Sequence, residues 1–377
     1  MIIEADYLIE KDGIRENVSI KVKGKGSSYV KTIVAPGYAD AHAHPHVVDI
    51  GENRRKWRNS WEWLRERNLR VDERALRQDI DLCTKLTLAT LYKSLLEGTT
   101  LVALVGNIYA NLKGIKISVT RPRIVLTPTI LNRDGWIDPI TTIEMATTLA
   151  DKYSDGDVKV GLFVHSLYFT LPEFIKSSYW IACENNIPFA MHLSEGRREL
   201  SEFEKIVGEN HNGVIGVHCI EDEEYSANNV KVVHCPYSNL LLYGRTLNKI
   251  DEIAALGTDW PLLNGGMPEQ HSLAVRIHGS SFREAIFYKA HFGGYEIYNM
   301  SLSGDYVGFD YEPERVFEGG VLPRIVIVNN KVSVYEKSII NLEYNYNDIL
   351  KLTKSLIKEC LEKYPARNHT NGEGNRY

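Results

Sequence analysis

The stretch that decides the fold is IVAPGYADAHAH, at residues 33–44. It begins as a short apolar run and ends on the polar side chains of His42 and His44. Strands that are apolar throughout are typical of parallel sheets, where both faces are buried. Because strand side chains alternate between two faces, His42 and His44 point to the same side. We therefore predict a buried strand that presents two imidazoles near its C-terminal end.

Seven further runs of this kind follow, with amphipathic or mixed segments between most of them. Apolar strands alternating with helices indicate βαβ units. Eight strands spread over roughly 260 residues fit a (β/α)₈ barrel, for which about 250 residues is typical. The fold class predicted is therefore α/β, with a TIM-like barrel. The eight runs are 33–39, 99–105, 123–130, 158–164, 187–191, 213–217, 230–233 and 252–256.

Both chain ends return to the apolar–polar alternation of antiparallel strands. We predict that residues 1–36 and 300–337 together form a small β-domain beside a barrel at 37–299. Residues 338–377 are expected to add a helix at 349–364 and a polar tail from 368. Helical spacing also predicts helices over 74–97 and 172–184.

Composition narrows the class of protein. The chain is 44% hydrophobic with a mean hydropathy of −0.25, which excludes a disordered chain and provides a large core. A net charge of −5 argues against nucleic acid, and we interpret the basic cluster at 54–58 and the mixed charges at 62–74 as solvated surface. No run is long enough for a membrane span. Five cysteines without a CxxC motif, and no secretory signal at the start, favour a cytoplasmic location.

Polar residues gather where the predicted strands end, which is where such barrels carry their catalytic groups. Six of the 12 histidines lie there, and Asp259 ends a seventh run. His42 and His44, joined by His192 and Asp259 from other strands, make a His₃Asp set. Such nitrogen and oxygen ligands suit one Zn²⁺ or Fe²⁺ ion and leave a position open for water. The six histidines are His42, His44, His165, His192, His218 and His234.

Two further inferences come from residue spacing. Glu195 follows His192 by three residues, so its carboxylate reaches the site only if the chain turns after the strand, as Ser194 and Gly196 permit. There it would move protons between water and a leaving nitrogen. Cys219 and Cys235 directly follow strand-end histidines and are expected to face the outer helices.

These residues carry a family resemblance. Residues 36–44, PGYADAHAH, resemble the first-strand signature of the amidohydrolase superfamily. Later segments resemble its aminohydrolase and chlorohydrolase branch, which includes S-adenosylhomocysteine/adenosine-type and guanine deaminases and triazine hydrolases. They occur in the family's order and cover roughly residues 1–335. The segments are LEGTT at 96–100, VHSLYFT at 164–170, HLSE at 192–195, VHC at 217–219, VHCPYSN at 233–239 and LGTD at 256–259.

The resemblance implies a role for each matching residue. His42, His44, His192 and Asp259 would hold one metal ion, and His218 would hydrogen-bond the metal-bound hydroxide or the substrate. Glu195 would protonate the substrate, while Asp259 accepts the proton of the water. His165 and His234 would line the substrate pocket. Apart from the resemblance, Trp260 and Trp136 would favour stacking on a flat ring if they lie near the pocket mouth. These assignments are the site residues that we expect.

The chain also departs from the family pattern. No lysine follows the fourth strand, where VHS stands at 164–166, so the binuclear chemistry of dihydroorotases and ureases is not expected. Trp260-Pro261 replaces the small, polar residues usual after the aspartate, and segment 107–138 matches no family pattern. These departures bear on the substrate more than on the ligand set.

The leading hypothesis is a hydrolase of C–N bonds that deaminates a small N-heterocycle such as a purine or pterin. Metal-bound hydroxide would attack the amino-bearing carbon and ammonia would leave. Dechlorination of a heterocycle and opening of a cyclic amide use the same groups and stay open. A barrel that binds a metal or ligand without catalysis is the alternative from another class. Substrate, choice of Zn²⁺ or Fe²⁺, and oligomeric state, including a homo-oligomer, are not decided by the sequence.

Overall fold

The computed structural model contains eight parallel strand positions. The structure describes residues 1–366 except 25–26, 53–54, 154–155, 210 and 343, and the predicted polar tail lies outside the described residues. Two of the eight strands are interrupted, the third at Pro128 and the fourth at Gly161. In order, the strands are β4 (Tyr38–Ala43), β5 (Thr99–Leu104), β6 (Arg123–Leu126) with β7 (Thr129–Ile130), β8 (Val158–Val160) with β9 (Leu162–Val164), β10 (Phe189–Leu193), β11 (Val214–His218), β12 (Val230–His234) and β13 (Ile253–Leu256).

Parallel pairing connects these strands all the way round. One run of paired strands is β4-β5-β6-β8 and the other is β7-β9-β10-β11-β12-β13. Beyond β13 the chain meets the end of β4, where the Asp259 amide donates to the His42 carbonyl at 2.9 Å and the His44 amide donates to the Asp259 carbonyl at 2.6 Å. The (β/α)₈ barrel predicted from the sequence is confirmed. The bonds that complete the ring belong to three of the four predicted metal ligands.

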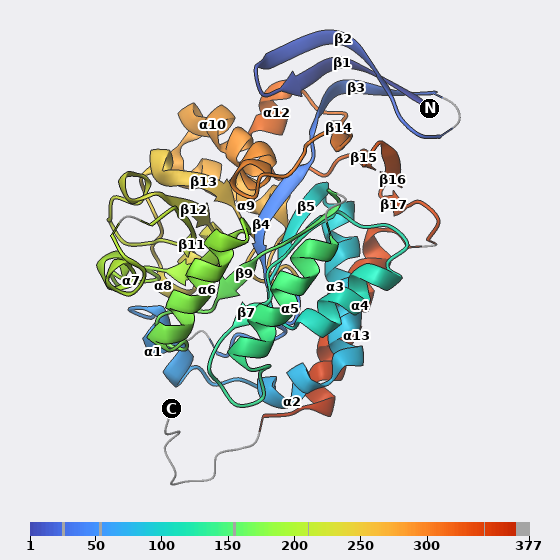
Figure 1. Cartoon of the computed structure of the whole chain (residues 1–377). Helices are drawn as coiled ribbons and strands as arrows, with labels where there is room; N and C mark the ends of the chain where they lie inside the picture. The colour runs from blue at the N-terminus through green and yellow to red at the C-terminus, as the bar shows by residue number, and fades with distance from the viewer. Residues whose placement is uncertain (25–26, 53–54, 154–155, 210, 343, 367–377) are drawn as a thin grey trace.

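Helices cover the outside of the barrel (Figure 1). The predicted helix at 74–97 is two helices, because Asp79 leaves the helical conformation and its carboxylate accepts the Leu82 amide as an N-cap. The helices are α1 (Ser60–Glu66), α2 (Glu73–Gln78), α3 (Ile80–Leu96), α4 (Ile108–Ile117), α5 (Pro139–Lys152), α6 (Pro172–Glu184), α7 (Leu200–Val207), α8 (Pro236–Tyr243), α9 (Met267–His278), α10 (Arg283–Tyr288), α11 (Gly294–Ile297), α12 (Pro313–Phe317) and α13 (Tyr346–Lys363).

Small and β-branched side chains fill the barrel interior. Ala39, Val125 and Ala190 belong to this inner cluster, together with Tyr295 and Tyr298 at the end of α11. The Tyr298 hydroxyl donates to the Ala41 carbonyl at 2.9 Å, which ties the tyrosine to the first strand. The interior is therefore packed, and the open end of the ring is left for the site.

A seven-stranded sheet combines three strands from residues 2–36 with four strands from residues 306–339, and its N-terminal strands lie at the top of Figure 1. Its third strand in chain order runs through Pro36 directly into β4, so this sheet is joined to the barrel's first strand. None of the described helices is both long and apolar enough to cross a membrane. The sheet order is β17 (Ser338–Ile339), β16 (Lys331–Tyr335), β15 (Ile325–Val328), β14 (Tyr306–Phe309), β3 (Ser27–Pro36), β1 (Ile2–Glu10) and β2 (Gly13–Lys21).

Candidate metal centre

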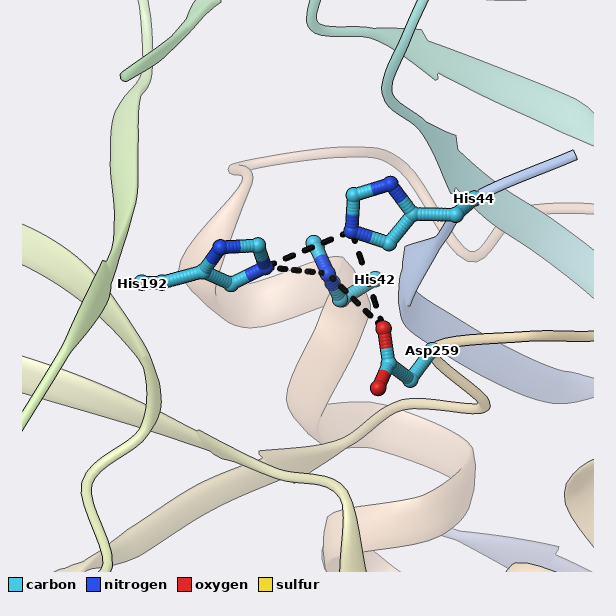
Figure 2. Close-up of side chains that lie close together, drawn as sticks. All are labelled: His42, His44, His192 and Asp259. Carbon is cyan, nitrogen blue, oxygen red and sulfur yellow. Dashed lines mark hydrogen bonds and ion pairs between the residues drawn. The ribbon is translucent and has the colours of Figure 1, made fainter. Parts of the chain in front are cut away.

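Four side chains from three strands converge at one end of the ring (Figure 2). His42 lies in β4 and His44 follows it, His192 lies in β10, and Asp259 follows β13. One ligand atom from each lies within 4.8 Å of all the others. The structure thus brings together residues that are up to 217 positions apart in the chain, from 42 to 259.

The distances between the four ligand atoms resemble those of a coordination shell. His192 Nε2 lies 3.2 Å from His42 Nε2 and 3.3 Å from His44 Nε2. Asp259 Oδ1 lies 3.7 Å and 3.6 Å from the same two atoms. Ligands about 2.0–2.1 Å from a tetrahedral zinc ion stand about 3.3–3.4 Å from one another. The geometry therefore fits one small divalent cation.

The protonation state of the histidines also suits a metal. Burial lowers the pKa of His192 and of His44 well below the ordinary value, and neighbouring histidines lower both further. Burial also lowers the pKa of His42, although Asp259 opposes the shift. Neutral imidazoles keep the nitrogen lone pairs that bind metal ions. With the anionic oxygen of Asp259, the donor set fits Zn²⁺ or Fe²⁺.

A buried carboxylate holds the Asp259 turn in place. Asp40 Oδ1 accepts the Thr258 amide at 2.9 Å, and its Oδ2 accepts the Thr258 hydroxyl at 2.6 Å. Asp259 itself has a left-handed backbone, with φ of 63°, which is costly for a residue other than glycine. Asp40 was not among the residues predicted from the sequence, although Asp40 continues the two-residue spacing of His42 and His44.

Glu195 and His218 lie beside the metal ligands. Glu195 Oε1 accepts the Tyr243 hydroxyl at 2.6 Å and lies 3.7 Å from His218 Nε2. Burial raises the pKa of Glu195, against the lowering effects of His218 and Tyr243. A raised pKa makes this carboxyl group able to hold a proton near neutral pH.

The hydrogen bonds of His218 fix its orientation. Asn239 Nδ2 donates to Thr246 Oγ1 at 3.0 Å, so its Oδ1 faces His218 and accepts Nδ1–H at 2.7 Å. The lone pair of His218 is then on Nε2, the atom near Glu195. Asn239 and Tyr243 were not predicted from the sequence, because both lie in α8 and not at the end of a strand.

The pocket above the ligands contains about 640 Å³ of space without atoms, part of it open to solvent. His165 and Trp260 line it, as do His192, Glu195, His218 and Asp259. Trp260 is buried, with its ring centroid 5.8 Å from that of Trp63. Trp63, Trp136 and Phe169 complete an aromatic lining.

The structure does not place His234 in this pocket. Val233 and Cys235 belong to the cluster inside the barrel, so the intervening His234 points outward. Its ring centroid lies 5.6 Å from that of His278 on α9. The expectation that His234 lines the pocket is therefore corrected by the alternation of β12. The same alternation corrects Cys235, which faces inward, whereas Cys219 packs with the outer cluster as expected.

A group of charged residues forms the wall of the pocket contributed by α1, α2 and the loop after β7. We call Arg67, Glu73, Arg77 and Arg133 the arginine wall. Arg67 donates to Glu73 at 2.7 Å, whereas Arg77 lies 3.8 Å from the same carboxylate. Arg67 and Glu73 belong to the stretch that we had interpreted as solvated surface. Their side chains are only 9% and 17% exposed, because α1 and α2 fold over the pocket.

Comparison with known proteins gives two curated relatives, each named 5-methylthioadenosine/S-adenosylhomocysteine deaminase. The protein from Acetivibrio thermocellus is 27% identical over 292 residues, which are 69% of this chain and 63% of that protein. The one from Pyrococcus furiosus is 27% identical over 288 residues, 68% of this chain and 67% of that protein. The match to the first therefore spans less than two thirds of its length. No family model matches the chain.

Solved structures share the fold. An adenosine deaminase from Xanthomonas campestris with bound zinc has a TM-score of 0.76 at 15% identity, covering 95% of this chain and 98% of that one. A guanine deaminase from C. acetobutylicum has a TM-score of 0.67 at 18% identity, covering 88% of this chain and 99% of that one. The chain is therefore similar in sequence to two deaminases and similar in fold to two others.

A third solved structure with this fold contains zinc. It is the atrazine chlorohydrolase from Arthrobacter aurescens TC1, with a TM-score of 0.73 at 17% identity and coverage of 94% of this chain and 99% of that one. The shared fold agrees with the resemblance inferred from the sequence.

Proposed function

We propose that this chain is a metal-dependent hydrolase that deaminates a small N-heterocycle, with a purine as the first candidate. The observation that carries the proposal is the convergence of three Nε2 atoms and Asp259 Oδ1, with Glu195 and His218 beside them. The two curated relatives, both named as deaminases, support the choice of reaction. In that reaction water adds to the amino-bearing carbon, the C–N bond breaks and ammonia leaves.

We assign one divalent ion, Zn²⁺ or Fe²⁺, to His42, His44, His192 and Asp259. When bound, such an ion lowers the pKa of its water to about 7 and so supplies a nucleophile at neutral pH. The side chains do the rest. Asp259 accepts the proton of the water on its free carboxylate oxygen, and His218 Nε2 accepts a hydrogen bond from the attacking group or the substrate.

Glu195 is the proposed proton donor to the ring nitrogen of the substrate. Its raised pKa favours the protonated carboxyl, and the Tyr243 hydroxyl fixes the position of Oε1. His165 and Trp260 are the proposed substrate-binding residues of the pocket wall. His234 takes no part, since its side chain points away from the pocket.

The remaining proposals concern the whole protein. We propose a small-molecule partner and a cytoplasmic location, which the five free cysteines support, and we propose the division into a composite β-domain, a barrel and a C-terminal helix. Strand β17 at Ser338–Ile339 pairs within the end sheet, two residues past the boundary at 337.

Removal and restoration of the metal tests the function. Chelated protein should release no ammonia from a panel of purines and pterins, and Zn²⁺ or Fe²⁺ should restore activity. His192→Ala should remove both bound metal and activity, whereas His278→Ala, which alters a half-buried histidine outside the site, should keep both. Activity that is indifferent to chelation and to His192→Ala would contradict the proposal. Metal binding without any hydrolysis would instead favour a non-catalytic barrel, and release of chloride or a ring-opened product would favour the other hydrolytic reactions.

A further inference from the structure

The arginine wall has more positive than negative charge. Arg67, Arg77 and Arg133 face one carboxylate, that of Glu73, in the same pocket as the metal ligands. The side chains of Arg67 and Arg77 are 9% and 10% exposed. Buried charges are normally paired, because an isolated ion loses its hydration without compensation. Two buried guanidinium groups that share one carboxylate leave one positive charge unmatched.

Arg77 is the residue whose pairing is incomplete. Its nearest carboxylate oxygen, on Glu73, is 3.8 Å away, too long for a hydrogen bond, and Glu73 already accepts Arg67 at 2.7 Å. Within the described residues no hydrogen-bond acceptor is found for the Arg77 guanidinium. Burial and the nearby Arg67 and Arg133 lower its pKa, as expected where compensating anions are few.

The arginines are held in a way that leaves their N–H groups available. The guanidinium of Arg77 stacks on Trp136 at 4.0 Å, and that of Arg67 stacks on Trp63 at 4.6 Å. Stacking covers the faces of the guanidinium plane, while the N–H donors point outward along its edges. Planar, pre-oriented donors of this kind suit the two oxygens of a carboxylate or phosphate.

The arginine wall is adjacent to the proposed reaction site. All three arginines act electrostatically on His165, whose ring centroid is 5.1 Å from that of His192. A substrate whose ring lies at the metal ligands can therefore extend past His165 to the arginine wall.

We infer that the substrate carries an anionic oxygen group, a phosphate or a carboxylate, which Arg77, Arg67 and Arg133 bind while the heterocycle lies at the metal. This inference rests on the proposed function for the identity of the ring, but the anion subsite does not depend on turnover. A substrate of this class differs from neutral bases and nucleosides by its negative charge.

Binding measurements with matched probes test the subsite. The zinc-loaded full chain is titrated by calorimetry with adenosine, adenosine 5′-monophosphate, S-adenosylhomocysteine, inorganic phosphate and acetate. We expect at least one phosphate or carboxylate probe to bind about tenfold or more tightly than adenosine, with the preference falling at high salt. Comparison of the phosphate and carboxylate probes identifies the anion. Ammonia release from the same nucleosides is measured separately, so loss of the proposed reaction is distinguished from loss of the subsite.

Three variants make the test specific. Arg77→Gln should remove the preference for the anionic probe while adenosine affinity changes little, and Arg77→Lys should restore part of it. Arg133→Gln alters an exposed side chain, so it reports on the subsite even if Arg77→Gln fails to fold. Arg74→Gln, on the same helix but outside the pocket, is the matched control and should keep the preference.

Each result of these binding measurements supports or overturns the inference. A preference in the wild type that disappears in Arg77→Gln or weakens in Arg133→Gln supports the inference. Equal affinity for adenosine and the anionic probes, no measurable binding of any anionic probe, or an equal loss for neutral and anionic probes in both variants would overturn it. The last result would mean that the arginine wall only holds α1 and α2 in place.

Discussion

At the scale of single residues, the polar contacts behind the ligands decide how well the site is ordered. Thr258 donates twice to the buried Asp40, and Asp259 is the next residue in the chain. Burial raises the pKa of Asp40 to about 7, although hydrogen bonds from Thr258 and His42 oppose the shift. Asp259 is the one carboxylate among the four proposed ligands. The turn before it is therefore held to Asp40 by the amide and the hydroxyl of Thr258.

We expect Thr258→Val to weaken zinc binding by about tenfold or more, because second-shell contacts orient the ligands that they touch. Thr258→Ser keeps the hydroxyl and should retain most of the affinity. Competition with a chelating indicator measures both constants. Equal zinc affinity in Thr258→Val and the wild type would show that the Asp40 contact does not position Asp259.

A second residue-scale prediction concerns Tyr243, which donates to Glu195 Oε1. This hydrogen bond lowers the pKa of Glu195 against the larger effect of burial, so its removal raises that pKa further. In Tyr243→Phe the part of the pH–rate profile that reports Glu195 should move to higher pH, and kcat should fall by up to about tenfold.

The matched control for that experiment is Tyr237→Phe, which alters an exposed tyrosine on the same helix. Its pH–rate profile should coincide with that of the wild type. If the profile of Tyr243→Phe also coincided, Tyr243 would have no part in holding the proton of Glu195.

At the scale of elements, the break between α2 and α3 connects the site to the C-terminal helix. Asp79 Oδ1 caps α3 by accepting the Leu82 amide, and its Oδ2 accepts Lys363 Nζ at 2.7 Å and the Tyr364 hydroxyl at 2.8 Å. Helix α2, which carries Glu73 and Arg77, ends at this residue. The cap therefore fixes the orientation of the arginine wall as well as the start of α3.

We predict that Asp79→Ala lowers the free energy of unfolding by about 1–2 kcal/mol, as loss of an N-cap usually does. Asp79→Asn keeps a capping oxygen and should cost less, since an ion pair with a lysine that is 54% exposed contributes little. Urea denaturation of the three proteins measures these differences. An Asn variant as unstable as the Ala variant would assign the effect to the ion pair instead.

The pH dependence of this cap has a definite sign. Burial alone would raise the pKa of Asp79, but hydrogen bonds from Lys363, Leu82 and Tyr364 lower it from 3.8 to about 2. A lowered pKa in the folded state stabilises the protein above pH 4, and that contribution is lost as the pH falls toward 2. The stability difference between wild type and Asp79→Asn should shrink over the same range.

The elements also show how far sequence patterns reach. The two-residue spacing of His42 and His44 and the strand-end position of His192 predicted side chains that lie together at the metal centre. Strand-end position alone gave the wrong side for His234, because alternation along β12 turns its side chain outward. At His218 the backbone has left the extended conformation, with φ of 73°, so alternation does not apply there. The arginine wall could not be predicted, since its residues come from short helices and a loop without strand periodicity.

At the scale of the whole molecule, the metal centre and the closure of the barrel involve the same residues. The two hydrogen bonds that join β13 to β4 are made by the backbones of His42, His44 and Asp259.

A ligand that binds only the folded state stabilises it by mass action, by about 2.7 kcal/mol at 100 times its dissociation constant. Zinc should therefore raise the melting temperature of the chelated protein, and His192→Ala should abolish the rise. An equal rise in the variant would place the bound zinc elsewhere.

The most direct test of the central claim is to locate the metal in crystals of the zinc-loaded protein by anomalous diffraction at the zinc edge. We predict one strong peak about 2.0–2.2 Å from the Nε2 atoms of His42, His44 and His192 and from Asp259 Oδ1. A peak coordinated by other side chains, or no peak at this position in zinc-saturated crystals, would contradict it.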